Sequence, residues 1–261
     1  MNVQAYTTKL QAGLGLIPET ERLLQLWEPG MNSRALLDRA LENGDFPTMT
    51  ARRLRNVISE CFAPRFLVNG AQPATMLKSM QYAVSKDDLK QIYFLYTSRA
   101  NPILADFVRD VYWPQYAAGA MTITKMDAIN FVEDAVAEGK TTTPWSESTR
   151  TRVSSYILGA CADFGLLGKM ETGSRKIETF RPTSIAVNFL AHDLHFRGLS
   201  DNAVLSHTDW HLLGLRAEDT LAELKQIALR GEIIVQSAAG LVQISWKHKN
   251  LEEFANAITH S

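Results

Sequence analysis

Apolar residues recur at intervals of three and four along most of the chain, which is the spacing of amphipathic α-helices. Start and stop signals agree with this period, since Pro18 opens one such segment, Pro29-Gly30 ends it and Gly44 ends the next. The pattern therefore predicts a mainly α fold. Helices are expected at residues 19–27, 33–43, 48–62, 123–139, 146–164, 183–197, 217–230 and 251–258, with further helices between residues 71 and 119 that Pro102 and Pro114 divide.

The period of the apolar residues changes to two at two places. Residues 165–182 alternate around Gly173-Ser174, and residues 232–246 alternate around Ala-Ala-Gly at positions 238–240. Alternation around a glycine-containing turn is typical of a β-hairpin. We therefore predict one hairpin directly after the helix at 146–164 and a second, small hairpin near the C-terminus.

These elements suggest four consecutive domains. Residues 1–70 predict an N-terminal helical domain with a helix-turn-helix, and residues 71–120 predict a helical hub rich in aromatic residues. Residues 121–198 follow the order helix, connector, helix, hairpin, which is the order of a winged helix-turn-helix. Residues 199–261 predict a C-terminal helix-hairpin-helix segment.

Composition and charge restrict what this fold can bind. The chain has 261 residues, 46% hydrophobic and 21% charged, and a formal net charge of −1. So small a net charge does not attract nucleic acid or anionic lipid, so any such binding must come from local clusters of charge. Cys61 and Cys161 lie in apolar helical patterns and are expected to be reduced core residues. No segment reaches the roughly 20 apolar residues of a membrane span or resembles a signal peptide, so a cytoplasmic protein without membrane contact is expected.

The segment at 146–164 has two different faces on a helical wheel. Its buried stripe is predicted to consist of Val153, Ile157, Ala160 and Phe164. Its opposite face consists of Ser148, Thr151, Arg152, Ser155 and Gly159. Short hydroxyl side chains let a helix approach DNA and bind phosphates, and arginine binds phosphate or guanine. Arg175 and Lys176 at the tip of the following hairpin are expected to act as a basic wing.

The segment at 48–62, which Pro64 follows, has the same two-sided pattern. Its predicted buried stripe consists of Leu54, Val57, Ile58 and Cys61, and its outward face carries Arg52, Arg53, Arg55 and Asn56. Thr50 is expected to cap this helix, which puts the arginines at the end that meets DNA in a recognition helix. Three outward arginines predict salt-dependent contact with phosphates. The helix at 33–43 would be its helix-turn-helix partner.

A histidine group is the third candidate site. It consists of His192, His195, His207 and His211, with Asp193 and Asp209 between them. Imidazole and carboxylate groups are metal ligands, so a metal-dependent hydrolase is one hypothesis for this group. Neither histidine pair encloses the glutamate of an HExxH motif, and no P-loop or nucleophile elbow is present. We therefore expect polar residues at helix ends, with no cofactor, no metal and no enzymatic activity.

Several segments together resemble the BrxA family, the small accessory proteins of BREX bacteriophage-defence systems. These segments are YTTKLQAGLGLIPETERLLQLW, RALLDRALENG, TARRLRNVIS and SSYILGACADFGLL. The resemblance implies a helical protein with helix-turn-helix elements, partly similar to the antitermination protein NusB, that binds double-stranded DNA. It also implies partners in the BREX system, among them a methyltransferase, a phosphatase-like protein and an ATPase. The family has no catalytic motif to transfer to this chain.

The sequence therefore favours a non-enzymatic accessory protein that binds double-stranded DNA through two helix-turn-helix surfaces, mainly by the phosphate backbone. A protein–protein adaptor without DNA contact is the first alternative. Its hot spots would be aromatic residues of the hub, namely Tyr93, Phe94, Tyr96, Trp113 and Tyr116. RNA binding is the second alternative, and it rests on the similarity to NusB alone.

Overall fold

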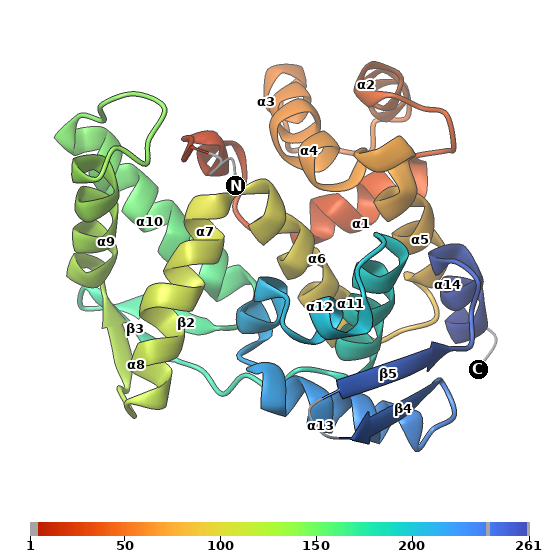
Figure 1. The fold of residues 1–261 in the computed structure, drawn as a ribbon. Coiled ribbons are helices and arrows are strands. Elements are labelled where there is room, and N and C mark those ends of the chain that lie inside the picture. The colour runs from red at the N-terminus through yellow and green to blue at the C-terminus, as the bar shows by residue number, and fades with distance from the viewer. Residues whose placement is uncertain (1–4, 239–240, 260–261) are drawn as a thin grey trace. The chain divides into compact units, whose positions relative to one another are not determined.

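The structure, a computed structural model, describes residues 5–238 and 241–259 and is mainly helical, which confirms the predicted fold class (Figure 1). The chain forms two compact units built from alternating segments. The first unit contains the chain up to Ala74 together with Tyr96–Phe180, and the second contains Thr75–Leu95 and the chain from Arg181 onward. These two units differ from the four consecutive domains expected from the sequence, because residues 71–120, expected to be one hub, contribute to both units.

The first unit begins with short helices. They are η1 (Lys9–Ala12), α1 (Ile17–Leu26), α2 (Ser33–Glu42), α3 (Ala51–Asn56), η2 (Val57–Phe62), α4 (Ala63–Phe66) and η3 (Asn69–Ala71). The segments α3, η2 and α4 form one continuous helix, so the predicted end at residue 62 is wrong. Pro64 normally breaks an α-helix because it has no N–H and its ring clashes with a carbonyl one turn earlier. The π-helical turn η2 precedes it, and this wider turn accommodates the ring.

The hub is helical, as predicted, and it too contains a π-helical turn directly before a proline. It consists of α5 (Gln72–Met80), α6 (Lys86–Ala100), α7 (Pro102–Phe107), η4 (Val108–Tyr112) and α8 (Trp113–Ala117). Pro102 opens α7, where its missing N–H would have no partner in any case. Pro114 was expected to divide the helix but lies inside it, directly after the π-helical turn η4.

A three-stranded sheet and two helices follow in the first unit. In chain order they are β1 (Thr122–Thr124), α9 (Lys125–Ala137), α10 (Glu147–Asp163), β2 (Leu167–Glu171) and β3 (Ser174–Ile177). The strands are antiparallel in the order β1-β3-β2. Strand β1 was predicted to be the start of a helix at 123. The helix begins later because Thr124 accepts a hydrogen bond from the Asp127 N–H at 3.1 Å and donates its own N–H to the Asp127 carboxylate at 2.7 Å.

The predicted hairpin at 165–182 is present, but its turn lies one residue earlier than expected. Thr172 and Gly173 occupy the two turn positions, with φ of 44° and 84°. Two consecutive positive φ angles match the right-handed twist of the flanking strands. Glycine adopts such an angle without strain, whereas the β-branched side chain of Thr172 does not.

The second unit is built around a helix that is buried on all sides. Its later elements are α11 (Ser184–Phe196), α12 (Asp201–Leu205), η5 (Thr208–Leu213), α13 (Ala217–Ala228), β4 (Ile233–Ala238), β5 (Leu241–Trp246) and α14 (Leu251–Thr259). Residues Ala186–Leu194 of α11 are all buried. Strands β4 and β5 pair antiparallel from Ile233 opposite Trp246, as the predicted C-terminal hairpin requires. The turn predicted at 238–240 lies partly outside the described residues.

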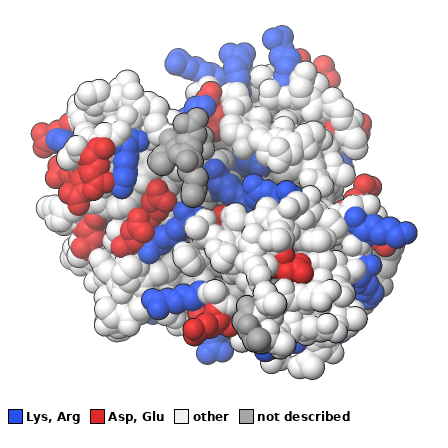
Figure 2. Space-filling view, viewed as in Figure 1, with Lys and Arg blue, Asp and Glu red and all other residues white. Residues whose placement is uncertain are grey.

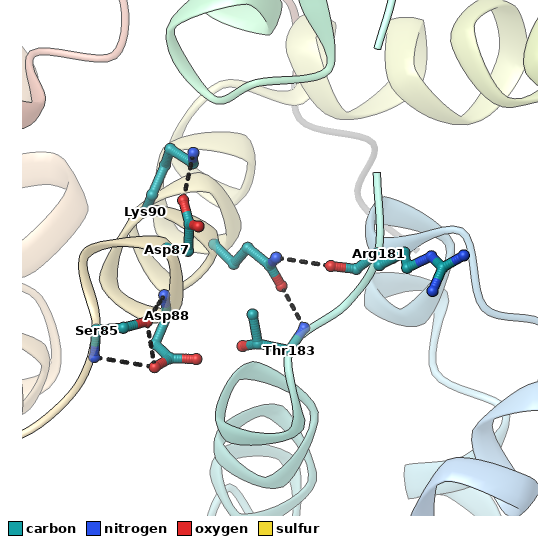
Figure 3. A network of polar contacts seen from close by, with 7 residues as sticks. Ser85, Asp87, Asp88, Lys90, Arg181 and Thr183 are labelled. Carbon is teal, nitrogen blue, oxygen red and sulfur yellow. Dashed lines mark hydrogen bonds and ion pairs between the residues drawn. The ribbon is translucent and has the colours of Figure 1, made fainter. Parts of the chain in front are cut away.

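A polar network fixes the start of α11 against α6 in the second unit (Figure 3). Gln91 donates to the carbonyl of Arg181 and accepts from the N–H of Thr183, both at 2.9 Å. Ser85 caps the first turn of α6, because its hydroxyl accepts from the Asp88 N–H at 3.1 Å while the Asp88 carboxylate accepts from the Ser85 N–H at 3.0 Å. Because Gln91 is buried, both halves of its amide are satisfied by backbone groups.

Candidate nucleic-acid interface

Four exposed residues of α3 form a surface that we call the N-terminal edge: Arg52, Arg53, Arg55 and Asn56. Thr50 caps the helix, since its hydroxyl accepts from the Arg53 N–H at 3.2 Å, as the sequence predicted. The predicted stripe of Leu54, Val57, Ile58 and Cys61 is buried, so the arginines point away from the core. Figure 2 shows Lys and Arg side chains that project from the part of the surface where α3 lies in Figure 1.

The three arginines of the N-terminal edge keep their charge available. Glu60, the acid nearest to them in sequence, lies 3.8 Å from Lys9. Within residues 5–238 and 241–259, no carboxylate lies within 4 Å of Arg52, Arg53 or Arg55. An exposed cation without an internal partner is the group that binds a phosphate at low cost.

The first half of α10 forms a second surface, the central edge, which consists of Ser148, Thr151, Arg152 and Ser155. The predicted stripe of Val153, Ile157, Ala160 and Phe164 is buried. Ser148, Arg152 and Ser155 are exposed and Thr151 is half-buried. The Ser155 hydroxyl donates to the Thr151 carbonyl at 3.0 Å, and that of Ser148 lies 3.1 Å from the Ser146 hydroxyl. Arg152 is thus the cation that this edge presents.

Of the two cations that the sequence predicted to point outward at the hairpin tip, Arg175 and Lys176, only Lys176 is exposed. Lys176 is exposed and lies 3.4 Å from Glu178. Arg175 is half-buried, and its Nη1 donates to the Gly168 carbonyl at 2.8 Å. The backbone of Arg175 pairs with Met170 on β2 and with Ile123 on β1, so Arg175 lies on the middle strand of the sheet. Arg175 therefore holds the hairpin through Gly168, and Lys176 is the predicted tip cation that remains exposed.

Gly159 was predicted to face outward but is buried, because the N-terminal arm covers the second half of α10. We define this arm as residues 5–16. A Cβ atom added to Gly159 would lie 2.6 Å from Leu14 Cδ1. The Gly15 N–H donates to the Asp163 carboxylate at 2.9 Å. The central edge is therefore limited to the first half of α10.

The other side of the arm is held by a buried arginine that the sequence analysis missed. Arg65 on α4 is 2% exposed. Its guanidinium donates to the carbonyls of Gly13 at 3.0 Å, Leu14 at 2.9 Å and Gly15 at 3.3 Å. Burial lowers the pKa of Arg65. The sequence signal for the close packing of the arm is the GLGL run, because a Cβ atom on Gly13 would clash with Leu16 and one on Gly15 would clash with Asp163.

The family model for BrxA matches residues 4–193. The chain belongs to the BrxA family. The match contains both edges and the arm and ends inside α11. Family membership associates the chain with BREX systems in an accessory role.

Comparison with solved structures agrees with the fold. The chain is similar to a crystal structure of an uncharacterized protein from Magnetospirillum magneticum, with a TM-score of 0.57 and 15% sequence identity. The similarity covers 73% of this chain and 94% of that one. At this identity the likeness concerns the fold alone. No curated protein matches the chain.

The histidine group has a structural role in this BrxA-family chain. His192 stacks on Phe254 with ring centroids 4.2 Å apart, and His195 stacks on Trp246 at the same distance. His207 accepts from the Asp209 N–H at 3.1 Å and caps η5. Within the described residues, no three His, Cys, Asp or Glu side chains are placed to hold a metal ion. The geometry therefore gives no support to a metal-dependent hydrolase.

The aromatic residues proposed as hot spots are mostly core. Tyr93, Phe94 and Tyr96 are buried, and Trp113 and Tyr116 are half-buried. Trp113 packs edge-on against Phe180 with ring centroids 5.8 Å apart. These rings therefore stabilise the hub. In the described part of the chain, no helix is long and apolar enough to cross a membrane.

Proposed function

We propose that this BrxA-family chain is a non-enzymatic accessory protein of a BREX system that binds double-stranded DNA, mainly through phosphates, at its N-terminal and central edges. The observation that carries the proposal is the arrangement of exposed cations. Arg52, Arg53 and Arg55 have no acidic partner within the described residues and lie in the first two turns of a capped helix that follows another helix. This is how a helix-turn-helix presents its recognition helix to DNA.

The topology around the central edge supports the same proposal. The order is helix (α7 to α8), strand β1, helix α9, helix α10 and hairpin β2–β3, with sheet order β1-β3-β2. A winged helix-turn-helix has this order, and its second helix of the pair and its hairpin face DNA. The buried Ser154 hydroxyl donates to the Ala128 carbonyl at 3.1 Å and so ties α10 to α9. Arg152 and Lys176 would be its cations.

A salt series of duplex binding tests the proposal. The triple variant Arg52→Ala/Arg53→Ala/Arg55→Ala is expected to bind duplex DNA about tenfold or more weakly at 0.1 M salt, equally for unrelated sequences. The slope of log K against log salt should fall by up to ~2.7, because each lost phosphate contact removes ~0.9. Arg152→Ala/Lys176→Ala should lower it by up to ~1.8.

The matched control for the triple variant is Lys225→Ala/Lys247→Ala/Lys249→Ala, which removes three exposed cations of the second unit. Its affinity and slope should remain close to those of the unmodified chain. A triple variant of the N-terminal edge that binds like this control would remove that edge from the proposal. Preference for single-stranded RNA in competition would replace DNA by RNA as the ligand.

A protein–protein adaptor is the second candidate function. Three exposed methionines favour it, namely Met121 before β1, Met126 in α9 and Met170 in β2. Methionine-rich surfaces are common where proteins bind one another. The expected partners are the BREX methyltransferase, phosphatase-like protein and ATPase. Co-purification with these proteins, without retention on duplex DNA at low salt, would favour this candidate over the first.

A further inference from the structure

We propose that the N-terminal arm is a brace that holds the N-terminal edge and the central edge in one fixed arrangement, so that both bind the same duplex. The inference rests on the function proposed above and assigns Arg65 and Asp163 as positioning residues. Neither residue contacts DNA in this proposal. Each acts through the arm on the helix that carries an edge.

The arm contacts the helix of the N-terminal edge through Arg65. Arg65 lies on α4, which continues α3 without a break. It donates to three consecutive carbonyls of the arm, those of residues 13–15. A buried guanidinium held only by carbonyls needs all of them in place, because each lost hydrogen bond leaves a desolvated charge. This requirement fixes the arm against α4.

Two of these three arm residues, Leu14 and Gly15, also contact α10. The Gly15 N–H donates to Asp163, and Leu14 fills the space above Gly159. A Cβ atom on Gly15 would lie 2.6 Å from the Asp163 Cβ, so the two backbones are as close as the side chains allow. Helix η1 of the arm packs against both η2 and α10. Figure 1 shows this segment, in red, between the green α10 and the orange α3 and α4.

A third contact extends the brace to the connector between α9 and α10. The Tyr6 N–H donates to the Lys140 carbonyl at 2.7 Å, and its carbonyl accepts from the Thr142 N–H at 3.1 Å. The Tyr6 hydroxyl donates to Asp106 at 2.6 Å. The arm thus holds α10 at its end, through Asp163, and before its start, through the connector.

A fixed arrangement of two weak edges has a consequence for binding. Once one edge is bound, the second meets the same duplex at an effective concentration that the brace determines. The first unit has about 160 residues, so it is about 40 Å across. A 24-base-pair duplex of about 80 Å is long enough to reach both edges.

The test compares Asp163→Ala with Asp163→Asn. Both variants remove the same negative charge, but only asparagine keeps an oxygen that can accept from the Gly15 N–H. On a 24-base-pair duplex we expect Asp163→Ala to bind about three- to tenfold more weakly than Asp163→Asn. In a background of Arg152→Ala/Lys176→Ala, which leaves one edge, the two variants should bind equally. Urea unfolding of both variants checks that each is folded at the temperature of the assay.

Each outcome decides the matter. Equal binding of Asp163→Ala and Asp163→Asn in the otherwise unmodified chain overturns the brace. A difference that persists when only one edge remains also overturns it, because the effect would then be local to α10. Failure of the unmodified chain to bind duplex DNA would instead contradict the proposed function, and that result is seen before any variant is compared.

Discussion

Lowering the pH from 7 to 4.5 is expected to reduce the free energy of unfolding of the second unit by about 2 kcal/mol through His192 alone. His192 is fully buried, and its Nδ1 lies 2.9 Å from the Asn188 carbonyl. Burial lowers its pKa from 6.5 to about 4. The unfolded chain therefore binds a proton near pH 6.5, whereas the folded chain excludes it until the pH is near 4.

The sign follows from this difference. Between pH 6.5 and pH 4 the unfolded state binds more protons, so stability rises with pH in this window. The contribution of His192 is fully present above pH 6.5 and is lost as the pH falls toward 4. Burial also lowers the pKa of His195, whose ring stacks on Trp246, and Asp201 opposes that shift. His195 therefore adds to the loss in the same direction.

Urea unfolding at the two pH values measures the effect. His192→Phe keeps a flat ring against Phe254 and should lose about 2 kcal/mol less than the unmodified chain on acidification. His211→Gln is the matched control, because His211 is exposed, and it should show the full acid loss. An unchanged acid loss in His192→Phe would show that His192 is not the group responsible.

Arg65→Met is expected to lower the free energy of unfolding by about 3 kcal/mol. The substitution leaves the carbonyls of residues 13–15 buried without the guanidinium, at roughly 1–3 kcal/mol for each unsatisfied group. The loss is smaller than the sum because methionine removes the cost of burying a charge. Urea unfolding at pH 7 measures it.

Two variants make that result specific. Arg65→Lys keeps a charge and three donors and should lose less stability than Arg65→Met. Arg55→Met replaces an exposed arginine on the same continuous helix and should change stability by no more than about 0.5 kcal/mol. Equal stability of Arg65→Met and Arg55→Met would contradict the role assigned to the three carbonyls.

The features that local spacing determines could be predicted from the sequence. The buried stripes of α3 and α10 and the exposed positions of Arg52 and Arg152 follow from a period of 3.6 residues. The cap at Thr50 follows from the preference of helix starts for a hydroxyl. Both edges therefore lie where the sequence placed them, although their binding of DNA stays a prediction.

The errors come from contacts between residues distant in sequence. Gly159 is buried because Leu14 covers it, and a helical wheel contains no information on a segment about 150 residues away. Arg175 points inward because β1, which was read as part of a helix, pairs with β3 and makes β3 the central strand. Pro64 and Pro114 do not end their helices because π-helical turns precede them, and propensity alone does not reveal such turns.

The two free cysteines lie in the two elements that the arm joins. Cys61 is in η2, with its Sγ 3.9 Å from the Gly13 carbonyl, and Cys161 is in α10. Burial raises the pKa of Cys61 and raises that of Cys161 to about 12. Because the thiolate is the reactive form, neither thiol is alkylated while the fold is closed. Their alkylation rates therefore report local unfolding. If Cys61 is modified well before Cys161, the arm has dissociated from η2 while α10 is still packed.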